Sequence, residues 1–147
     1  TLGSYWEANM ELIDIIPEFN LYEEYWKIYT KSDRIPPQYI SSDAKITKCI
    51  IGEGSEIYGE VTNSVIGSGV VIEEGAVVKD SIIMQDSVIG KGAVVEKSII
   101  AEDEHSVIPE NVKIGKNTAI SGATAAEDYP NGELESGGYI IKAGGIV

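Results

Sequence analysis

The chain repeats itself at a fixed distance. The stretch VIEEGAVVKDSII at 71–83 returns as VIGKGAVVEKSII at 88–100, with nine of thirteen positions identical at an offset of seventeen residues. A regular repeat of this kind is typical of a solenoid, in which each repeat adds one unit to a stack. No single unit can bury its own interior, so each must present the same inward residues to the units above and below it. The repeat therefore predicts a stacked architecture.

Within the repeat, single apolar residues recur mostly every six residues. Six residues rotate an α-helix by about 600°, which would scatter these positions around its surface, so the spacing excludes a helix. A hexapeptide period is typical of parallel β-helices, in which about three short strands complete one coil. The pattern predicts an all-β solenoid over residues 40–124. The apolar positions are Ile40, Ile46, Ile51, Ile57, Val61, Ile66, Ile72, Val78, Ile83, Ile89, Val95, Ile100, Ile108, Ile114 and Ile120.

Stacking the coils at the observed offset predicts columns of equivalent residues. One inward column is expected to contain Ile46, Val61, Val78 and Val95. Three positions later comes a column of small side chains, interpreted as packing residues rather than nucleophiles, which contains Cys49, Ser64, Ser81 and Ser98. The glycine pairs at 52–54, 67–69 and 90–92 suit corners with positive φ. The coil that ends at Val61 is two residues shorter than the seventeen-residue repeat. The segment AEDEHSVI makes the coil that ends at Ile108 two residues longer than this repeat.

The residues before the repeats differ in composition. Residues 1–17 are expected to be mainly helical, with an amphipathic helix over 4–16 that has Ser4 as its N-cap, Glu7 as capping-box partner and an end at Pro17. Residues 18–39 contain several aromatic side chains and a Pro-Pro pair, which indicates an ordered connector rather than a flexible linker. Residues 125–147 are expected to form a carboxy-terminal tail and strand.

Composition limits the partners. Twenty-four acidic against eleven basic side chains give a net charge of −13, which disfavours both nucleic acid and anionic membrane surfaces. The single cysteine, Cys49, excludes an internal disulfide framework and argues against structural zinc. No apolar run approaches the roughly 20 residues of a membrane helix, and the amino terminus lacks a signal-like segment. The default expectation is a cytoplasmic protein.

His105 and Arg34 are each the single residue of their type and carry alternative interpretations. His105 is the only histidine and lies in a widened loop beside Asp103 and Glu104. Many hexapeptide-repeat proteins are acyltransferases with a histidine base at such a position, so one hypothesis is a general base acting with coenzyme A as donor. The favoured alternative is a solvated loop residue. Arg34 is the only arginine and either holds a phosphate group or pairs with one of the many carboxylates.

Three segments together resemble a known family. They are SYWEANMEL at 4–12, YEEYWKIYTKSDRIPPQYI at 22–40 and the repeats over 59–100. The chain resembles the carboxy-terminal third of bacterial ADP-glucose pyrophosphorylase, also called glucose-1-phosphate adenylyltransferase. The resemblance extends along nearly the whole chain, and the Trp-Glu-Ala-Asn and Pro-Pro-Gln-Tyr-Ile segments are its specific parts.

The resemblance implies a left-handed β-helix that takes part in subunit assembly and allosteric control. In that family a nucleotidyltransferase domain joins ATP to glucose 1-phosphate with magnesium, and the ADP-glucose that it makes serves glycogen or starch synthesis. The implied partners are the chain's own nucleotidyltransferase domain and like subunits, in a homo-oligomer that is a tetramer in the full enzyme. The role implied for this chain is assembly and regulation.

Little of the family's catalytic apparatus carries over. Thr1 matches the last residue of an Asp-Val-Gly-Thr motif, so the metal-binding Asp and the nucleotide loop fall outside the chain. We therefore expect no catalytic residue, no bound cofactor and no activity of this chain alone. Relatives activated by sugar phosphates place basic residues before the VIPE segment and in the final strand. Here these places offer Glu104 and His105, and Lys142 and Gly144, which argues against fructose-bisphosphate activation.

Arg34 and Lys142 stay as candidate regulatory residues. Two other functions stay open, namely a free-standing hexapeptide acyltransferase that uses His105 and the β-helix of another sugar-nucleotide pyrophosphorylase. The WEANM segment at 6–10 favours the adenylyltransferase, because an acyltransferase does not need this helix.

Overall fold

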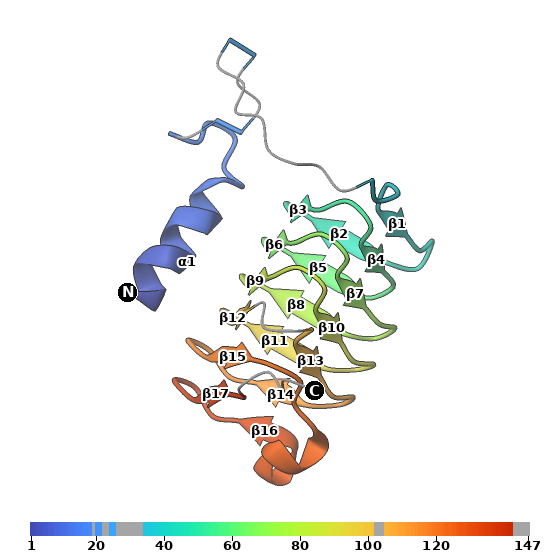
Figure 1. Ribbon diagram of the computed structural model, residues 1–147, viewed down its shortest axis with the longest axis vertical. Helices are drawn as coiled ribbons and strands as arrows, with labels where there is room; N and C mark the ends of the chain where they lie inside the picture. The colour runs from blue at the N-terminus through green and yellow to red at the C-terminus, as the bar shows by residue number, and fades with distance from the viewer. Residues whose placement is uncertain (19, 22–23, 26–33, 102–104, 143–147) are drawn as a thin grey trace.

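The computed structural model describes residues 1–18, 20–21, 24–25, 34–101 and 105–142. Helix α1 (Leu2–Glu11) precedes a stack of coils whose short strands form three parallel sheets along the stack (Figure 1). The predicted all-β solenoid of hexapeptide repeats is therefore confirmed. Its left-handed sense stays a prediction from the resemblance.

Each sheet takes one strand from successive coils. Sheet A contains β1 (Tyr39–Ile40), β4 (Glu56–Ile57), β7 (Val71–Ile72), β10 (Val88–Ile89) and β13 (Val107–Ile108). Sheet B contains β2 (Lys45–Thr47), β5 (Glu60–Thr62), β8 (Val77–Lys79), β11 (Val94–Glu96), β14 (Lys113–Ile114) and β16 (Glu133–Leu134). Sheet C contains β3 (Ile50–Ile51), β6 (Val65–Ile66), β9 (Ile82–Ile83), β12 (Ile99–Ala101), β15 (Ala119–Ser121) and β17 (Tyr139–Ile141).

The register of the strands matches the repeat in the sequence. Val78 pairs with Val95, at the offset of seventeen residues seen in the repeated stretches. Both predicted irregular coils are present, because Ile46 pairs with Val61 and Ile89 pairs with Ile108. The short coil arises where Tyr58 and Gly59 alone connect β4 to β5. A Cβ atom at Gly59 would overlap the carbonyl oxygen of Ala76, so this tight corner requires glycine.

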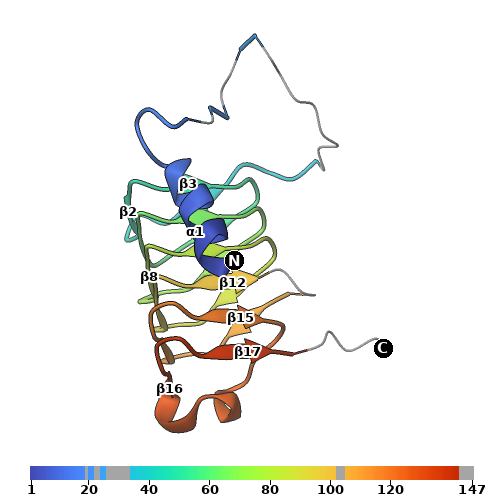
Figure 2. The same ribbon diagram turned by 90° about the vertical axis from the view of Figure 1, so that its left-hand side faces the viewer.

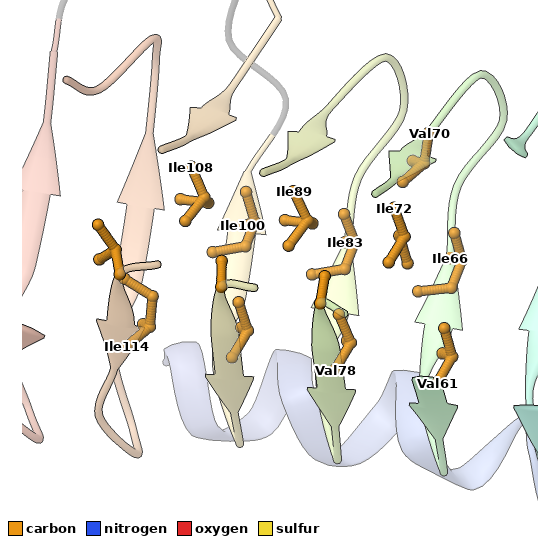
Figure 3. Close-up of a cluster of buried hydrophobic side chains, with 14 of the residues drawn as sticks. Val61, Ile66, Val70, Ile72, Val78, Ile83, Ile89, Ile100, Ile108 and Ile114 are labelled. Atoms are coloured by element: carbon orange, nitrogen blue, oxygen red, sulfur yellow. The ribbon is translucent and has the colours of Figure 1, made fainter. Parts of the chain in front are cut away.

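The core is a set of stacked aliphatic columns inside the solenoid. Figure 3 shows the side chains of successive coils lying above one another in the interior. Each fully buried isoleucine or valine contributes roughly 1.5–3 kcal/mol of hydrophobic free energy relative to an exposed one. The largest completely buried side chains are Ile57, Ile66, Ile72, Ile83, Ile89, Ile100, Ile108, Ile120, Val61, Val70, Val78 and Val95.

In the predicted column of small residues the three serines are buried and Cys49 is partly buried, and the serine hydroxyl groups form a hydrogen-bond ladder. Ser64 donates to the carbonyl oxygen of Thr62 at 2.7 Å and accepts the backbone N–H of Ser81 at 3.2 Å. Ser81 and Ser98 repeat this arrangement one coil further on. These hydroxyl groups satisfy buried backbone groups, which supports the packing interpretation over a nucleophile. Burial also raises the pKa of the Cys49 thiol, which keeps it protonated.

Backbone conformation at the corners confirms the reading of the glycine pairs and adds a column that the sequence analysis missed. Gly69 has a φ of 69°, and a Cβ atom at Gly67 would lie 2.6 Å from the backbone nitrogen of Gln85 in the next coil. Between sheets B and C, however, the positive-φ positions are not glycine except at Gly137 in the last coil. The other positions are Lys48, Asn63, Asp80, Lys97 and Asn117.

Helix α1 begins and ends earlier than predicted. The N-cap is Thr1 and not Ser4, because the Thr1 hydroxyl accepts the backbone N–H of Ser4 at 3.2 Å. The helix ends at Glu11, well before Pro17. Directly after Glu11 the chain makes i→i−3 hydrogen bonds, as from the Asp14 N–H to the Glu11 carbonyl. Such 3-10 geometry does not extend over long segments, so the helix does not continue to Pro17.

The solenoid continues past the predicted boundary at residue 124. Strand β16 pairs with β14, and β17 pairs with β15, so the carboxy-terminal segment adds two sides of a further coil. Two short 3-10 helices, η1 (Ala126–Asp128) and η2 (Pro130–Gly132), precede β16. Between them Tyr129 is only 3% exposed and joins the core, with its hydroxyl 2.6 Å from that of Thr124.

The inward register can be tested with two adjacent residues of β10. Ile89→Asp is expected to lower the free energy of unfolding by more than about 4 kcal/mol, because it places an unpaired carboxylate in the aliphatic core. Val88→Asp, whose side chain lies on the outer face, should cost less than about 1 kcal/mol. Urea unfolding followed by circular dichroism measures both. Equal losses for the two variants would show that the register is wrong.

Candidate functional site

Helix α1 packs along the corner between sheets B and C. Figures 1 and 2 show it alongside the sheet C strands, running across several coils. The Trp6 indole N–H donates to the main-chain oxygen of Asp80 at 2.7 Å. The Lys97 ammonium group lies 5.2 Å from the centre of the Trp6 ring, within range of a cation–π interaction. Trp6 therefore joins the helix to two successive coils.

A second contact lies beyond the carboxy-terminal end of α1. Asp14 forms an ion pair of 3.0 Å with Lys48, which belongs to the first coil. Both side chains are at least half exposed, so the pair contributes at most about 1 kcal/mol to stability. Along the same corner, the Asn63 amide donates to the Asp80 carboxylate at 2.6 Å. The positive-φ column thus presents its side chains to one another and to the helix segment.

The helix covers an apolar outer face of sheet C. Ile82 and Ile99 occupy outward positions on β9 and β12, one residue before the inward Ile83 and Ile100, yet they are only 3% and 6% exposed. Sequence analysis missed this surface. The signal was present in the doubled isoleucines at 82–83 and 99–100, because an outward isoleucine beside an inward one indicates a strand covered on both faces.

A groove remains where α1 begins. It has a volume of about 350 Å³ and is lined on the helix side by Leu2 and Trp6. On the solenoid side it is lined by Lys97, Ile99 and Tyr139, from three different strands or corners. The groove therefore continues the helix–sheet contact toward the last coil.

Of the predicted regulatory residues, Lys142 is engaged within the chain. Its ammonium group pairs with the carboxylate of Asp128 in η1. The same carboxylate oxygen accepts the backbone N–H of Ala125 at 2.7 Å. The Ala125 N–H first, and then the Lys142 charge, lower the pKa of Asp128 below its ordinary value. This pair ties the segment after β17 to the η1 turn.

Arg34 and His105 are both exposed. Arg34 precedes β1 at the first coil, whereas Lys142 follows β17 at the last, so the structure does not bring the two candidate regulatory residues together (Figure 1). His105 has a φ of 68° and occupies a corner between sheets C and A. Asp103 and Glu104 lie outside the described residues. The roles proposed for Arg34, Lys142 and His105 stay predictions.

Within the described ranges, no group of three or more His, Cys, Asp or Glu side chains is placed to hold a metal ion. The acidic pair at 73–74 instead contacts Lys91, whose backbone N–H donates to Glu73 at 2.8 Å and whose ammonium group bonds Glu74 at 3.1 Å. No helix in this part of the chain has the length and apolar character needed to cross a bilayer.

The anchoring role of Trp6 leads to a first prediction for the site. Trp6→Phe removes the hydrogen bond to Asp80 and keeps an aromatic ring, so the docking of α1 should weaken by about 1 kcal/mol. Amide hydrogen exchange in residues 6–11 should then accelerate about fivefold, while Tyr5→Phe on the same helix serves as the matched control. Unchanged exchange in Trp6→Phe would show that the indole does not hold the helix.

The Asp128–Lys142 pair leads to a prediction about pH. Because the folded-state pKa of Asp128 is lowered, its charge stabilises the fold above the ordinary pKa of aspartate, and this contribution is lost as pH falls through the lowered value. Asp128→Asn should reduce the melting temperature at pH 7, and the difference from the parent should shrink as pH falls from the ordinary pKa of aspartate through the lowered pKa of Asp128. Thermal melts across this range measure it, with Glu127→Gln as control. A difference independent of pH would contradict the assignment.

Three relatives carry the same name, glucose-1-phosphate adenylyltransferase. The protein from Lachnospira eligens is 61% identical over 98% of this chain, which corresponds to 42% of that protein. The proteins from Thermosipho melanesiensis and Thermotoga maritima are 56% and 47% identical over 72 residues, about half of this chain. The chain therefore spans about two fifths of the length of its Lachnospira relative, and matches the carboxy-terminal part of these enzymes.

The predicted resemblance is confirmed by these matches. A family model described as GlmU-like, C-terminal hexapeptide matches residues 35–126, the part of the chain that forms most of the three-sheet solenoid. The match with the Lachnospira relative extends beyond this region to include the α1 segment. The solenoid, its columns and these matches together show that the chain belongs to the family of GlmU-like carboxy-terminal hexapeptide domains.

Proposed function

We propose that this chain is the carboxy-terminal assembly and regulatory part of a glucose-1-phosphate adenylyltransferase, which makes ADP-glucose from ATP and glucose 1-phosphate for glycogen synthesis in the cytoplasm. One observation carries the proposal. The likeness to the Lachnospira relative covers 98% of the chain, and so includes almost all of residues 1–34, which the hexapeptide family model leaves out. A hexapeptide solenoid does not need this segment to close its coils, whereas a two-part enzyme needs a connection between its parts.

The structure supports a mechanical role for α1 in that connection. Trp6 is bonded to Asp80 and lies against Lys97, so the helix is attached to the middle of the stack rather than to its end. The stack itself is rigid, because each coil is hydrogen-bonded along three sheets to its neighbours. A domain joined through α1 would therefore keep a defined orientation relative to the solenoid.

Assembly with like subunits into a tetramer is part of the proposal. The first coil offers exposed apolar side chains for such contacts, since Tyr39 is 56% exposed and Ile40 is 47% exposed. The backbone edge of sheet A at β1 also has no further strand beyond it among the described residues. Exposed edges of this kind are sites where another chain can add.

The family that the chain resembles places its metal-binding Asp in the Asp-Val-Gly-Thr motif, whose last residue matches Thr1. Catalysis, ATP binding and glucose 1-phosphate binding are therefore assigned to the nucleotidyltransferase domain outside this chain. This chain's own contribution is position and assembly.

The experiment compares the intact protein, expressed with the coding sequence upstream of Thr1, with the chain alone. We expect the intact protein to form ADP-glucose from ATP and glucose 1-phosphate with magnesium, and to run as a tetramer in native mass spectrometry. The chain alone should form no ADP-glucose above a blank.

Two outcomes would contradict the proposal. One is an intact protein without ADP-glucose synthesis. The other is saturable binding of acetyl-coenzyme A by the chain that is lost in His105→Ala, which would favour the acyltransferase instead. The control for His105→Ala is Glu110→Gln, on the exposed surface. Ser106→Ala is unsuitable as a control, because the buried Ser106 hydroxyl donates to the main-chain oxygen of Ala101.

A further inference from the structure

The outer face of sheet C carries an apolar column along its whole length. The outward position of each strand is Ile50, Val65, Ile82, Ile99, Ala119 and Tyr139. Helix α1 covers the middle of this column, where Ile82 and Ile99 are almost fully buried. At the last coil the cover ends, and on β17 Tyr139 is 61% exposed and Ile141 is 78% exposed.

The groove at the start of α1 leads onto this uncovered part. Leu2 is 47% exposed and lines the groove together with Tyr139. Figures 1 and 2 place the amino terminus beside β12, with β15 and β17 next along the stack. Two strand spacings of about 4.8 Å separate β12 from β17. Three extended residues at about 3.4 Å each would span this distance.

The lining of the groove suits a polypeptide better than a charged small ligand. Among its lining side chains in the described structure, Lys97 is the single cation, and it lies over the Trp6 ring. A site for a phosphorylated ligand needs several convergent donors. A peptide segment needs apolar contacts and a few polar groups, which Leu2, Ile99, Tyr139 and Asn117 provide.

We propose that the groove and the outer face of β15 and β17 are a docking surface for an apolar segment of the polypeptide that precedes residue 1 in the intact protein. This proposal rests on the proposed function, since it assumes a preceding domain. The segment continues the cover that α1 provides over sheet C, and its docking seats the preceding domain against the last coils of the solenoid.

Hydroxyl-radical footprinting of the intact protein and of the chain alone tests this surface. Tyr25, which is 98% exposed and belongs to neither the groove nor the proposed assembly surface, is the reference for Tyr139, which is 61% exposed. We expect the ratio of Tyr139 oxidation to Tyr25 oxidation to fall about fivefold in the intact protein, as a docked aromatic side chain loses most of its exposed area. An unchanged ratio would overturn the proposal.

A variant of the intact protein tests the contact independently. Ile141→Asp should restore Tyr139 oxidation about fivefold, because a carboxylate disfavours an apolar partner, whereas Ile141→Val should keep Tyr139 protected. The high exposure of Ile141 means that neither substitution disturbs the core. Protection of Tyr139 that persists in Ile141→Asp would overturn the proposal.

Two further outcomes are separable in the same preparations. Concentration-dependent protection of Tyr139 in the chain alone would identify a second copy as the occupant, and would overturn the proposal. Absence of ADP-glucose synthesis by the unsubstituted intact protein would contradict the proposed function. The oxidation ratio would still decide whether the preceding polypeptide covers Tyr139.

Discussion

Every coil of this protein depends on its neighbours to bury its inward isoleucine and valine side chains. A single coil has three short sides and no interior of its own, so its aliphatic residues are removed from water only when the next coil supplies the same residues in register. The columns through Ile72 and Ile89, and through Val78 and Val95, meet this requirement. The polar groups depend on neighbouring coils in the same way. In the serine ladder from Ser64 to Ser98, each hydroxyl forms hydrogen bonds with backbone groups of its own coil and of the next.

This dependence makes the stack a rigid support with chemically distinct faces. The face of sheet B carries ion pairs between coils, such as Lys79 with Glu60 and Lys113 with Glu133. The face of sheet C is apolar and takes up α1. A helix attached through Trp6 to the main chain of Asp80 is attached to a corner that the core holds in place. The proposed role in positioning a second domain follows from this attachment, and needs no catalytic group in the solenoid.

The candidate functional residues show that a single position in the sequence is weak evidence for a functional role. Lys142 reads from the sequence as a free cation in a final strand, but its pairing with Asp128 depends on the η1 turn, which has no repeat signature. His105 occupies a positive-φ corner position, and the equivalent position one coil earlier is Asp86, which also has positive φ. A residue's uniqueness in the sequence therefore does not show whether it acts in function or in turn geometry.

The sequence by itself determined the solenoid, its inward columns, both irregular coils and the glycine corners. In a repeat that stacks on itself, the spacing of equivalent residues in the sequence equals the offset between paired strands, so it predicts the register. The sequence did not determine the cap of α1 at Thr1, the continuation of the stack through β16 and β17, or the burial of Ile82 and Ile99. Those features arise between segments that share no repeat, such as Trp6 with Asp80, and no spacing in the chain records such a contact. Only the tertiary structure decided these features, because they depend on where a segment without repeats packs against the solenoid.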